Sequence, residues 1–347
     1  MKTYRLGIVG LGRMGSTIDA EVEDYPAITL PYSIAAAAKA IPRIELAAGC
    51  DIVDEKNRAF REKWGVANTY TDYAKMLADE KLDMAAICTP GPLHARMTLA
   101  AAEAGVPMIY CEKAMACSMK EADEVKKTLE GRHTVFNTGV LRRFDPRYHQ
   151  ARELIRKGRI GTPRAAVHYA SASLLHGHIH SVDTILFLLG DRRVKSVWGE
   201  LRPRDIEIKN KRLDKDPLAI YQFEIEGGVE GVTVPAGNWD FEVIGDEGVL
   251  RSMNNNIEWS LRTRRPLGKK FHTFQPVEYP KVAPRSATVN CLKDLIEAYE
   301  KRRPSLGDVA GAHHATEVCL AVTESHLLKG RRVTLPMTNR DLYVYHF

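Results

Sequence analysis

The chain has 347 residues, and 50 Lys and Arg against 44 Asp and Glu give a formal net charge of +6. Apolar residues make up 44% and charged residues 27%, an ordinary globular composition that excludes collagen, coiled coil and extended disorder. No run approaches the roughly 20 apolar residues of a membrane-spanning helix, and the basic residues are dispersed. We therefore expect neither a membrane nor a nucleic-acid partner.

The beginning of the chain and its cysteines indicate a compartment. The first ten residues run directly into a strand-like segment and lack the apolar stretch and cleavage site of a signal peptide. The six cysteines include no C-x-x-C pair. Three of them, Cys50, Cys88 and Cys111, end apolar runs, where a cysteine is usually a small buried hydrophobe. We expect a cytoplasmic protein with reduced thiols.

The first part of the chain alternates apolar runs with segments of helical period. The apolar runs are Arg5–Gly10, Ile44–Asp51, Asp83–Cys88 and Val106–Cys111. Their continuous apolar character predicts strands buried on both faces, as in a parallel sheet. The segment between the last two runs has helical spacing, and Gly105 is its candidate end. This order predicts a doubly wound α/β domain, a Rossmann fold, over residues 1–125.

Residues 126–347 have a different pattern. A connecting strand at His133–Val140 precedes a helix that opens at Asp145-Pro146 and ends near Gly158. Further strands are expected at 164–173, 194–201, 218–226, 229–235 and 241–245, with a tight turn at Gly227-Gly228. Two helices are expected, at 287–301 and 308–328. Because few helices separate these strands, the pattern predicts a second α/β domain with an antiparallel or mixed sheet.

A glycine pattern follows the first predicted strand. Gly10-x-Gly12-x-x-Gly15 lies between that strand and a predicted helix. Gly10 permits a tight turn, Gly12 lets the backbone approach a pyrophosphate, and Gly15 lets the helix pack closely on the sheet. The helix N-terminus attracts phosphate. This position in the chain predicts a dinucleotide site that includes Arg13 and Met14; the alternative is a purely structural glycine turn.

The second predicted strand supplies a candidate ribose ligand. Asp51 ends that strand, although it lies well beyond the usual spacing of about 20 residues from the glycines. The segment 26–43 is interpreted as an insertion whose alanine-rich part forms an extra helix. Ile52 follows Asp51, and no adjacent cation is expected to neutralise it. A carboxylate repels a 2′-phosphate, so the sequence favours NAD over NADP. The alternative ribose ligand is Asp54.

Several segments together resemble the glucose–fructose oxidoreductase / inositol dehydrogenase (Gfo/Idh/MocA) family. They are GIVGLGRMG, ICTPGPLHARMTLAAAEAG, the pair Glu112-Lys113, RRFDPRYHQARELIRKGRIG and HSVDTILFLLG, and the closing segment from PSLGDVAG to RRVTLP also fits. The resemblance implies a Rossmann domain and a substrate-binding domain with a large open, mainly antiparallel sheet that carries a homodimer or homotetramer interface. It also implies hydride transfer between NAD and a sugar or cyclitol. Thr89, Pro90, His94 and Glu112 are then expected beside the cofactor.

The resemblance also implies a base. Family members usually have Glu-Lys-Pro where this chain has Glu112-Lys113-Ala114, and their lysine helps to move the proton of the reacting hydroxyl. Lys113 follows a predicted strand at its carboxyl end, where ligands bind in open α/β sheets. An alcohol that gives up a hydride must also lose its proton, and a lysine in this place can take it. The alternative for Lys113 is a surface ion pair with Glu112.

The family's second proton-transfer motif is altered. Relatives carry an Asp four residues before a His, and the alignment places that His at His180 and the Asp at His176. We expect His180 to be the proton-transfer partner of Lys113, and His176 to face the substrate. His178 between them allows a metal interpretation, but no acid or cysteine nearby completes a ligand set, so we expect no metal.

Other residues remain weaker candidates. His168 either faces the same site or is a buried, hydrogen-bonded histidine, and Asp183 is expected to be structural. Arg142, Arg143 and Tyr148 either meet a polar substrate or form a solvated helix start. Asn238 and Trp239 are candidates to line a sugar site, since aromatic faces stack on sugar rings.

Three functions are compatible with these residues. The first is an NAD-dependent dehydrogenase of a sugar, sugar acid or cyclitol. The second is a glycoside hydrolase that uses NAD for transient oxidation of a ring hydroxyl and elimination, on an acidic sugar glycoside. The third is a non-catalytic NAD-binding protein, against which the presence of Lys113 and His180 argues.

Overall fold

The computed structural model describes residues 2–347, which form two compact units. The first unit consists of the described residues up to Asp145, together with Arg285–His313 and His346–Phe347. The second consists of Pro146–Pro284 and His314–Tyr345. The division differs from the expected boundary after residue 125. The reason is that a sixth strand and a late helix complete the first unit.

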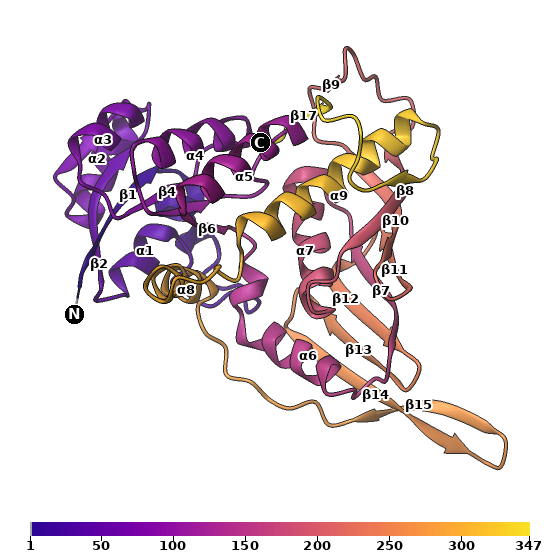
Figure 1. The fold of residues 1–347 in the computed structure, drawn as a ribbon. Coiled ribbons are helices and arrows are strands. Elements are labelled where there is room, and N and C mark those ends of the chain that lie inside the picture. Colours follow the sequence, from indigo (N-terminus) through magenta and orange to yellow (C-terminus); the bar gives the residue numbers. More distant parts are fainter. Residues whose placement is uncertain (1) are drawn as a thin grey trace. The chain divides into compact units, whose positions relative to one another are not determined.

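The first unit contains a parallel sheet with the strand order β3-β2-β1-β4-β5-β6 (Figure 1). Its strands are β1 (Tyr4–Val9), β2 (Ile44–Cys50), β3 (Asn68–Tyr70), β4 (Met84–Ile87), β5 (Met108–Cys111) and β6 (Val135–Thr138). Every residue of β4 and β5 is buried, which confirms that the apolar runs form the centre of a parallel sheet. The expected connecting strand is β6, which pairs in parallel with β5. Short, polar β3 carries no apolar run and was not expected.

Helical segments cover this sheet. They are η1 (Arg13–Thr17), η2 (Ile18–Glu21), α1 (Ile34–Lys39), α2 (Asp54–Trp64), α3 (Tyr73–Asp79), η3 (Gly91–Leu93), α4 (His94–Glu103), α5 (Met119–Arg132), η4 (Leu141–Phe144) and α8 (Ala287–Lys301). The expected extra helix of segment 26–43 is α1, which begins where the Ser33 hydroxyl accepts a hydrogen bond from the Ala36 N–H. Gly105 follows α4 with a φ of +82°, as expected for a helix end.

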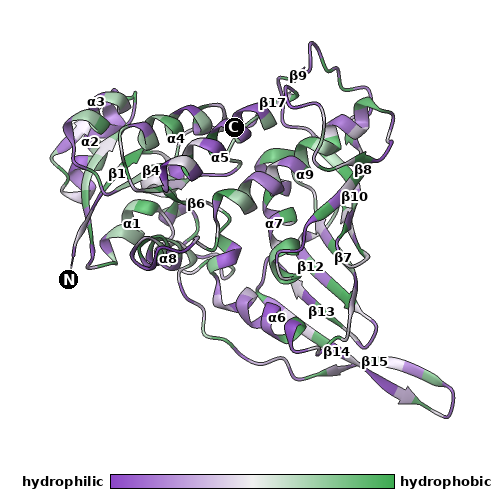
Figure 2. Ribbon diagram, in the orientation of Figure 1, coloured by the Kyte–Doolittle hydropathy of each residue, from purple (hydrophilic) through white to green (hydrophobic). Residues whose placement is uncertain are grey.

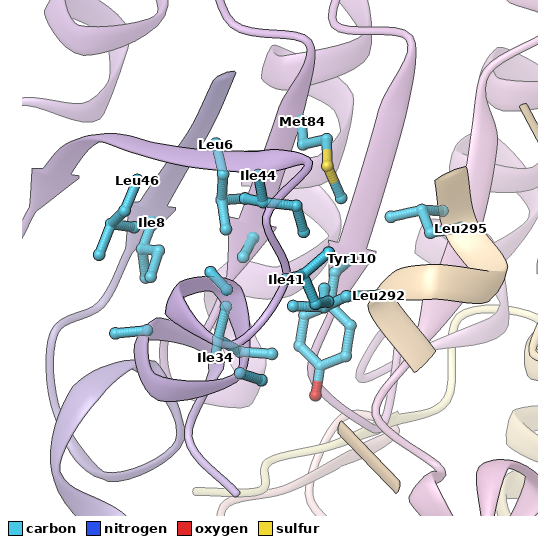
Figure 3. Close-up of a cluster of buried hydrophobic side chains, with 14 of the residues drawn as sticks. Leu6, Ile8, Ile34, Ile41, Ile44, Leu46, Met84, Tyr110, Leu292 and Leu295 are labelled. Carbon is cyan, nitrogen blue, oxygen red and sulfur yellow. The ribbon is translucent and has the colours of Figure 1, made fainter. Parts of the chain in front are cut away.

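The core of the first unit includes residues that are far apart in the sequence. Figure 3 shows side chains of β1, β2, α1 and α8 in one cluster. Leu292 and Leu295 of α8 are fully buried there with Leu6, Ile34 and Tyr110. The helix expected at 287–301 is therefore confirmed, and it belongs to the Rossmann unit because its apolar face is buried in that unit's core.

The second unit is built on a mixed sheet with the order β15-β14-β13-β12-β7-β11-β10-β8-β16. Its strands are β7 (Pro163–Ala170), β8 (Val194–Arg202), β10 (Leu218–Ile225), β11 (Val229–Val234), β12 (Asn238–Gly245), β13 (Gly248–Met253), β14 (Glu258–Leu267), β15 (Phe271–Val277) and β16 (Val333–Thr334). A small separate sheet pairs β9 (Arg212–Leu213) with β17 (Tyr343–Val344). Within the large sheet β7 and β11 are parallel and the other neighbours are antiparallel, which confirms the expected mixed sheet.

Two local predictions for this sheet can be compared with the structure. Gly227 and Gly228 connect β10 to β11 with φ angles of +84° and +72°, the conformation that a tight hairpin turn requires. The β14–β15 hairpin was not expected, because Arg262, Arg264 and Arg265 interrupt any alternating apolar pattern. Figure 2 shows this hairpin largely in hydrophilic colours.

The helical segments of the second unit are α6 (Pro146–Arg156), η5 (Leu174–His178) and α7 (Ile179–Leu188), and α9 (Val309–Leu327) carries residues of both units. As expected, α6 opens after Asp145 and ends before Gly158, whose φ is +71°. Within residues 2–347, no helix has the length and apolar character needed to cross a membrane.

A buried histidine precedes α7. His178 is 1% exposed, and its Nδ1 lies 3.1 Å from the hydroxyl of the fully buried Tyr221. Burial lowers the pKa of His178 from 6.5 to about 4, because a charged imidazolium loses its hydration there. The imidazole is therefore neutral at physiological pH and forms part of the polar packing beneath α7.

We predict that α8 contributes directly to the stability of the first unit. Replacing Leu292 by Ala should lower the free energy of unfolding by about 2–5 kcal/mol, since it leaves a cavity in the core. Urea unfolding checks this, and the exposed Lys293→Ala on the same helix is the control, expected to change it by less than about 0.5 kcal/mol. An L292A variant as stable as the parent would show that α8 does not share this core.

We also predict an acid-sensitive contribution from His178. The unfolded protein binds this proton near pH 6.5 and the folded protein only near pH 4, so acid favours unfolding between those values. The free energy of unfolding should fall by roughly 3 kcal/mol over this range from this group alone, and be unaffected above it.

Denaturant unfolding of His178→Gln from pH 7 to pH 4 checks this prediction. The variant should show a correspondingly shallower loss of stability with acid. His272→Gln removes an exposed imidazole and should retain the parent profile. Parallel profiles for the parent and His178→Gln would contradict the assignment.

Candidate functional site

The glycine loop after β1 has one open position. Gly10 has a φ of +90°, and a Cβ there would lie 2.5 Å from the Cys88 carbonyl oxygen. A Cβ on Gly15 would lie 2.0 Å from the Gly10 carbonyl oxygen. On Gly12 a Cβ would meet nothing nearer than the Lys56 Nζ at 3.9 Å. Side chains are therefore excluded from two glycines by the protein's own backbone, whereas the third leaves the space that a pyrophosphate needs.

The expected helix after this loop is replaced by the short turns η1 and η2. Asp19 accepts hydrogen bonds from the backbone N–H groups of Tyr32 and Ser33, at 2.7 and 3.2 Å, so it is held by the inserted segment. The exposed Arg13 pairs with Glu21, its Nε lying 2.8 Å from Oε2. Met14 is half-buried against the core. Local helical period in the sequence could not reveal this rearrangement, which depends on residues 26–43.

Asp51 follows β2 and is tied to the glycine loop. Its Oδ2 accepts a hydrogen bond from the Leu11 N–H at 3.0 Å, and its Oδ1 accepts one from Val53 at 3.1 Å. Contrary to the expectation that no cation neutralises it, the Lys56 Nζ lies 3.5 Å from Oδ2. Lys56 was overlooked because it is not adjacent to Asp51 in the sequence and is brought near it by the first turn of α2. Ile52 is 85% exposed, and the alternative ligand Asp54 is exposed in the first turn of α2.

His94 connects the loops after β4 and β5. Its Nε2 lies 2.6 Å from the carbonyl oxygen of Thr89, and its Nδ1 lies 2.7 Å from that of Ala114. Burial lowers the pKa of His94. Thr89 is half-buried and Pro90 is exposed. The ring lies between the two carbonyl oxygens and, when neutral, donates its one N–H to one of them, so the imidazole contacts both loops, a geometry that the sequence did not indicate.

Glu112 and Lys113 follow β5 directly. The buried Glu112 carboxylate accepts a hydrogen bond from the Tyr110 hydroxyl. A Cβ on Gly139 would lie 2.8 and 2.9 Å from the two carboxylate oxygens, so the glutamate fits because residue 139 is glycine. Lys113 is half-buried, and the peptide bond between Lys113 and Ala114 is cis. The lysine thus emerges at the carboxyl end of a central strand.

The three histidines before α7 have different environments. His176 is exposed, His178 is buried and His180 is half-buried. The Asp216 carboxylate accepts hydrogen bonds from the backbone N–H groups of Leu175 and His176, at 2.8 and 2.6 Å. This segment is π-helical up to His178 and α-helical from Ile179, so the spacing of one regular helix does not apply to it. Asp216 and His178 were not singled out as site residues, because each acts through distant contacts.

Trp239 lies beside two of the histidines. Its ring centroid is 5.5 Å from that of His168 and 6.1 Å from that of His180. Trp239 has a φ of +58° and is the extra residue at a shift in the β12–β7 register. A bulge of this kind re-aims a side chain, and such conformations concentrate at functional sites. His168 is fully buried with its Nε2 3.0 Å from the Ser181 hydroxyl, as its structural alternative anticipated.

The weaker candidates are largely internal. Arg143 is 6% exposed and donates to the Leu306 carbonyl oxygen at 3.3 Å. Tyr148 is fully buried, 5.1 Å from the ring of Trp259, and Asp183 is buried in α7. Arg143 and Tyr148 therefore do not form a solvated helix start.

The cysteines are consistent with reduced thiols. Among residues 2–347 the six cysteines form no disulfide, and five of them are buried, with Cys88 half-buried. Burial raises the pKa of Cys50 and of Cys111 to about 12, so these thiols remain protonated. Among residues 2–347, no group of three or more His, Cys, Asp or Glu side chains is placed to hold a metal ion.

Comparisons with known proteins bear on the family. The chain is 28% identical over 268 residues to inositol 2-dehydrogenase 3 of Saccharopolyspora erythraea, covering 72% of this chain and 73% of the relative. It is 25% identical over 210 residues to myo-inositol 2-dehydrogenase of Thermotoga maritima, covering 56% of this chain and 58% of the relative. Against that second relative the chain therefore matches little more than half of the length.

A solved structure shares the fold over nearly all of this chain. The aldose-aldose oxidoreductase of Caulobacter crescentus, in a complex with glycerol, superposes with a TM-score of 0.77 at 19% identity, covering 96% of this chain and 100% of that one. Residues 4–140 match the model of the GFO_IDH_MocA oxidoreductase family with its NAD-binding Rossmann fold. The resemblance found in the sequence is thereby confirmed over residues 4–140, which match the Gfo/Idh/MocA oxidoreductase family and its NAD-binding Rossmann fold.

Proposed function

We propose that this chain is an NAD-dependent dehydrogenase that oxidises a hydroxyl-bearing carbon of a sugar, sugar acid or cyclitol. The observation that carries the proposal is Lys113, a half-buried amine directly after β5 in a loop that His94 ties to the loop after β4. Both relatives named above are inositol dehydrogenases, which supports a cyclitol or sugar as the substrate class.

The carboxyl edge of the first sheet, meaning the loops after β1, β2, β4 and β5, would hold the cofactor. Gly12 offers the open position for the pyrophosphate, and Asp51 is the proposed ribose ligand. When bound there, NAD supplies the acceptor for the hydride. The other proposed contacts of the cofactor are Gly10, Arg13, Met14, Gly15, Ile52, Thr89, Pro90, His94, Glu112 and Lys113.

Proton transfer is the task of the chain's own side chains. An alcohol that loses a hydride must also lose its hydroxyl proton, and the base must stand within hydrogen-bond reach of that oxygen. Lys113 is the proposed base. His180 is proposed as a second proton-transfer group, supported by its half-buried imidazole next to Trp239. Lys113 and His180 belong to different units. If both act in the same proton transfer, the effects of the two single variants on kcat will not add in the double variant.

Two residues of the second unit, Trp239 and His176, support a carbohydrate-like ligand. Trp239 offers an indole face at a bulge, and such faces stack on sugar rings. His176 is exposed and would favour an acidic substituent when protonated. We therefore keep His176 as a proposed substrate contact, within a range of substrates that includes acidic sugars.

The glycoside hydrolase alternative has no support among the relatives described above. A net dehydrogenase releases one NADH per turnover, whereas the hydrolase cycle releases an aglycone without NADH. We also propose a cytoplasmic homo-oligomer. The cysteines, which form no disulfide among residues 2–347, favour a reducing compartment, and the half-exposed second face of strands such as β7 favours coverage by another copy.

Gly12 tests the cofactor site without disturbing the fold. Gly12→Ala has space for its Cβ, so the variant should unfold like the parent while binding NAD at least 10-fold more weakly, because the methyl occupies the pyrophosphate's space. Gly15→Ala should instead destabilise the protein, and Gly131→Ala, in open space on α5, should leave NAD binding unchanged without destabilising the protein. Unchanged NAD binding by G12A would show that the dinucleotide lies elsewhere.

Lys113 tests the reaction itself. Lys113→Met should retain the fold and NAD binding but lower kcat by roughly 100-fold or more, the usual scale for a lost acid–base group. NADH formation with a panel of cyclitols, sugars and sugar acids provides the measurement, and the exposed Lys127→Met is the matched control. Turnover near that of the parent would mean that the proton leaves by another route.

A further inference from the structure

Lys56 lies beside two parts of the proposed cofactor site, the ribose ligand Asp51 and the open space at Gly12. Its Nζ lies 3.5 Å from Asp51 Oδ2 and 3.9 Å from the position that a Cβ on Gly12 would take. The residue comes from the first turn of α2, outside the glycine loop. One ammonium group therefore adjoins the candidate ribose ligand and the candidate pyrophosphate space.

The carboxylate of Asp51 is held inside the protein. It is 8% exposed, and each oxygen accepts a backbone N–H hydrogen bond. The Asn57 side chain also fixes the Asp51 backbone, with hydrogen bonds of 3.1 and 2.7 Å. By contrast, the Lys56 side chain is 48% exposed. The ammonium is thus the solvent-facing member of the pair.

This arrangement changes the charge that an approaching ribose meets. A lone carboxylate at the end of β2 repels a 2′-phosphate, which is the usual basis for preferring NAD. Here a cation within ion-pair distance offsets that charge, and an ammonium is a common partner for phosphate. The first turn of α2 also carries two exposed acids, Asp54 and Glu55. The residue of this turn that forms an ion pair with Asp51 is Lys56.

We propose that Lys56 and Asp51 together form a subsite for the 2′-phosphate of NADP, so that the chain binds NADP as well as NAD. The proposal relies on the cofactor site proposed above. Asp51 holds the ribose hydroxyls of NAD, and Lys56 contacts the additional phosphate of NADP. The affinity for NADPH should consequently lie within about 10-fold of that for NADH.

The test is a titration of the full chain with NADH and with NADPH, followed by nicotinamide fluorescence. One ionic strength is used throughout, because salt screens exposed charges. Lys56→Gln should weaken NADPH by about 10-fold, equal to about 1.4 kcal/mol, and NADH by less than about 3-fold. Asp51→Asn should shift the preference toward NADPH. Arg58→Gln, an exposed cation on the same helix, should change neither affinity.

Several results would overturn the subsite. Equal weakening of NADH and NADPH in Lys56→Gln would assign the ammonium to the shared diphosphate. No change in either would leave Lys56 as a partner of Asp51 alone. Parent protein that binds NADH but not NADPH would refute the subsite and leave the dehydrogenase proposal intact, whereas failure to bind either dinucleotide would refute both.

Discussion

The carboxyl edge of the first sheet is held together by contacts between successive loops, and the rest of the site depends on them. The loop after β1 donates from Leu11 to the Asp51 carboxylate after β2. Gly10 approaches the backbone of Cys88 after β4 so closely that no side chain fits between them. His94 then joins the loops after β4 and β5 through two backbone carbonyls. Four separate segments are thereby fixed as one surface.

Fixed loops of this kind are what hydride chemistry needs. Orientation of reacting groups contributes much of the rate in enzymes, and a displacement of about 1 Å can cost roughly 100-fold. Ala114 follows the lysine proposed as base, where the resembling family usually has a proline. The carbonyl of Ala114 is instead held by His94, and the preceding Glu112 by the Tyr110 hydroxyl. Buried polar contacts on both sides therefore fix the position of the Lys113 backbone.

Much of this architecture could be predicted from the sequence, and the remainder shows where local pattern fails. Continuous apolar runs identified the central parallel strands, helical spacing identified α4, and the start at Asp145-Pro146 with the stop at Gly158 identified α6. The basic β14–β15 hairpin lacks an alternating pattern, so it escaped notice. The first unit extends past the expected boundary, since no local signal assigns the predicted strand β6, or the later helix α8, to the first core. The sequence also did not indicate the contacts of Lys56 with Asp51, of His178 with Tyr221, or of Asp216 with the backbone of residues 175 and 176, because folding brings these partners together.

The histidines of the second unit show how burial can assign roles that residue type cannot. His178 has a pKa of about 4, so it is neutral near pH 7 and serves Tyr221 as a packing and hydrogen-bonding partner. His168 is likewise buried, with Ser181 at its Nε2. His180 is half-buried and faces Trp239, and His176 is exposed. A proton carrier must exchange with its surroundings while touching the reacting group. His180 is the half-buried imidazole that adjoins Trp239, and for that reason it, and neither of the two buried imidazoles, is the proposed proton-transfer group.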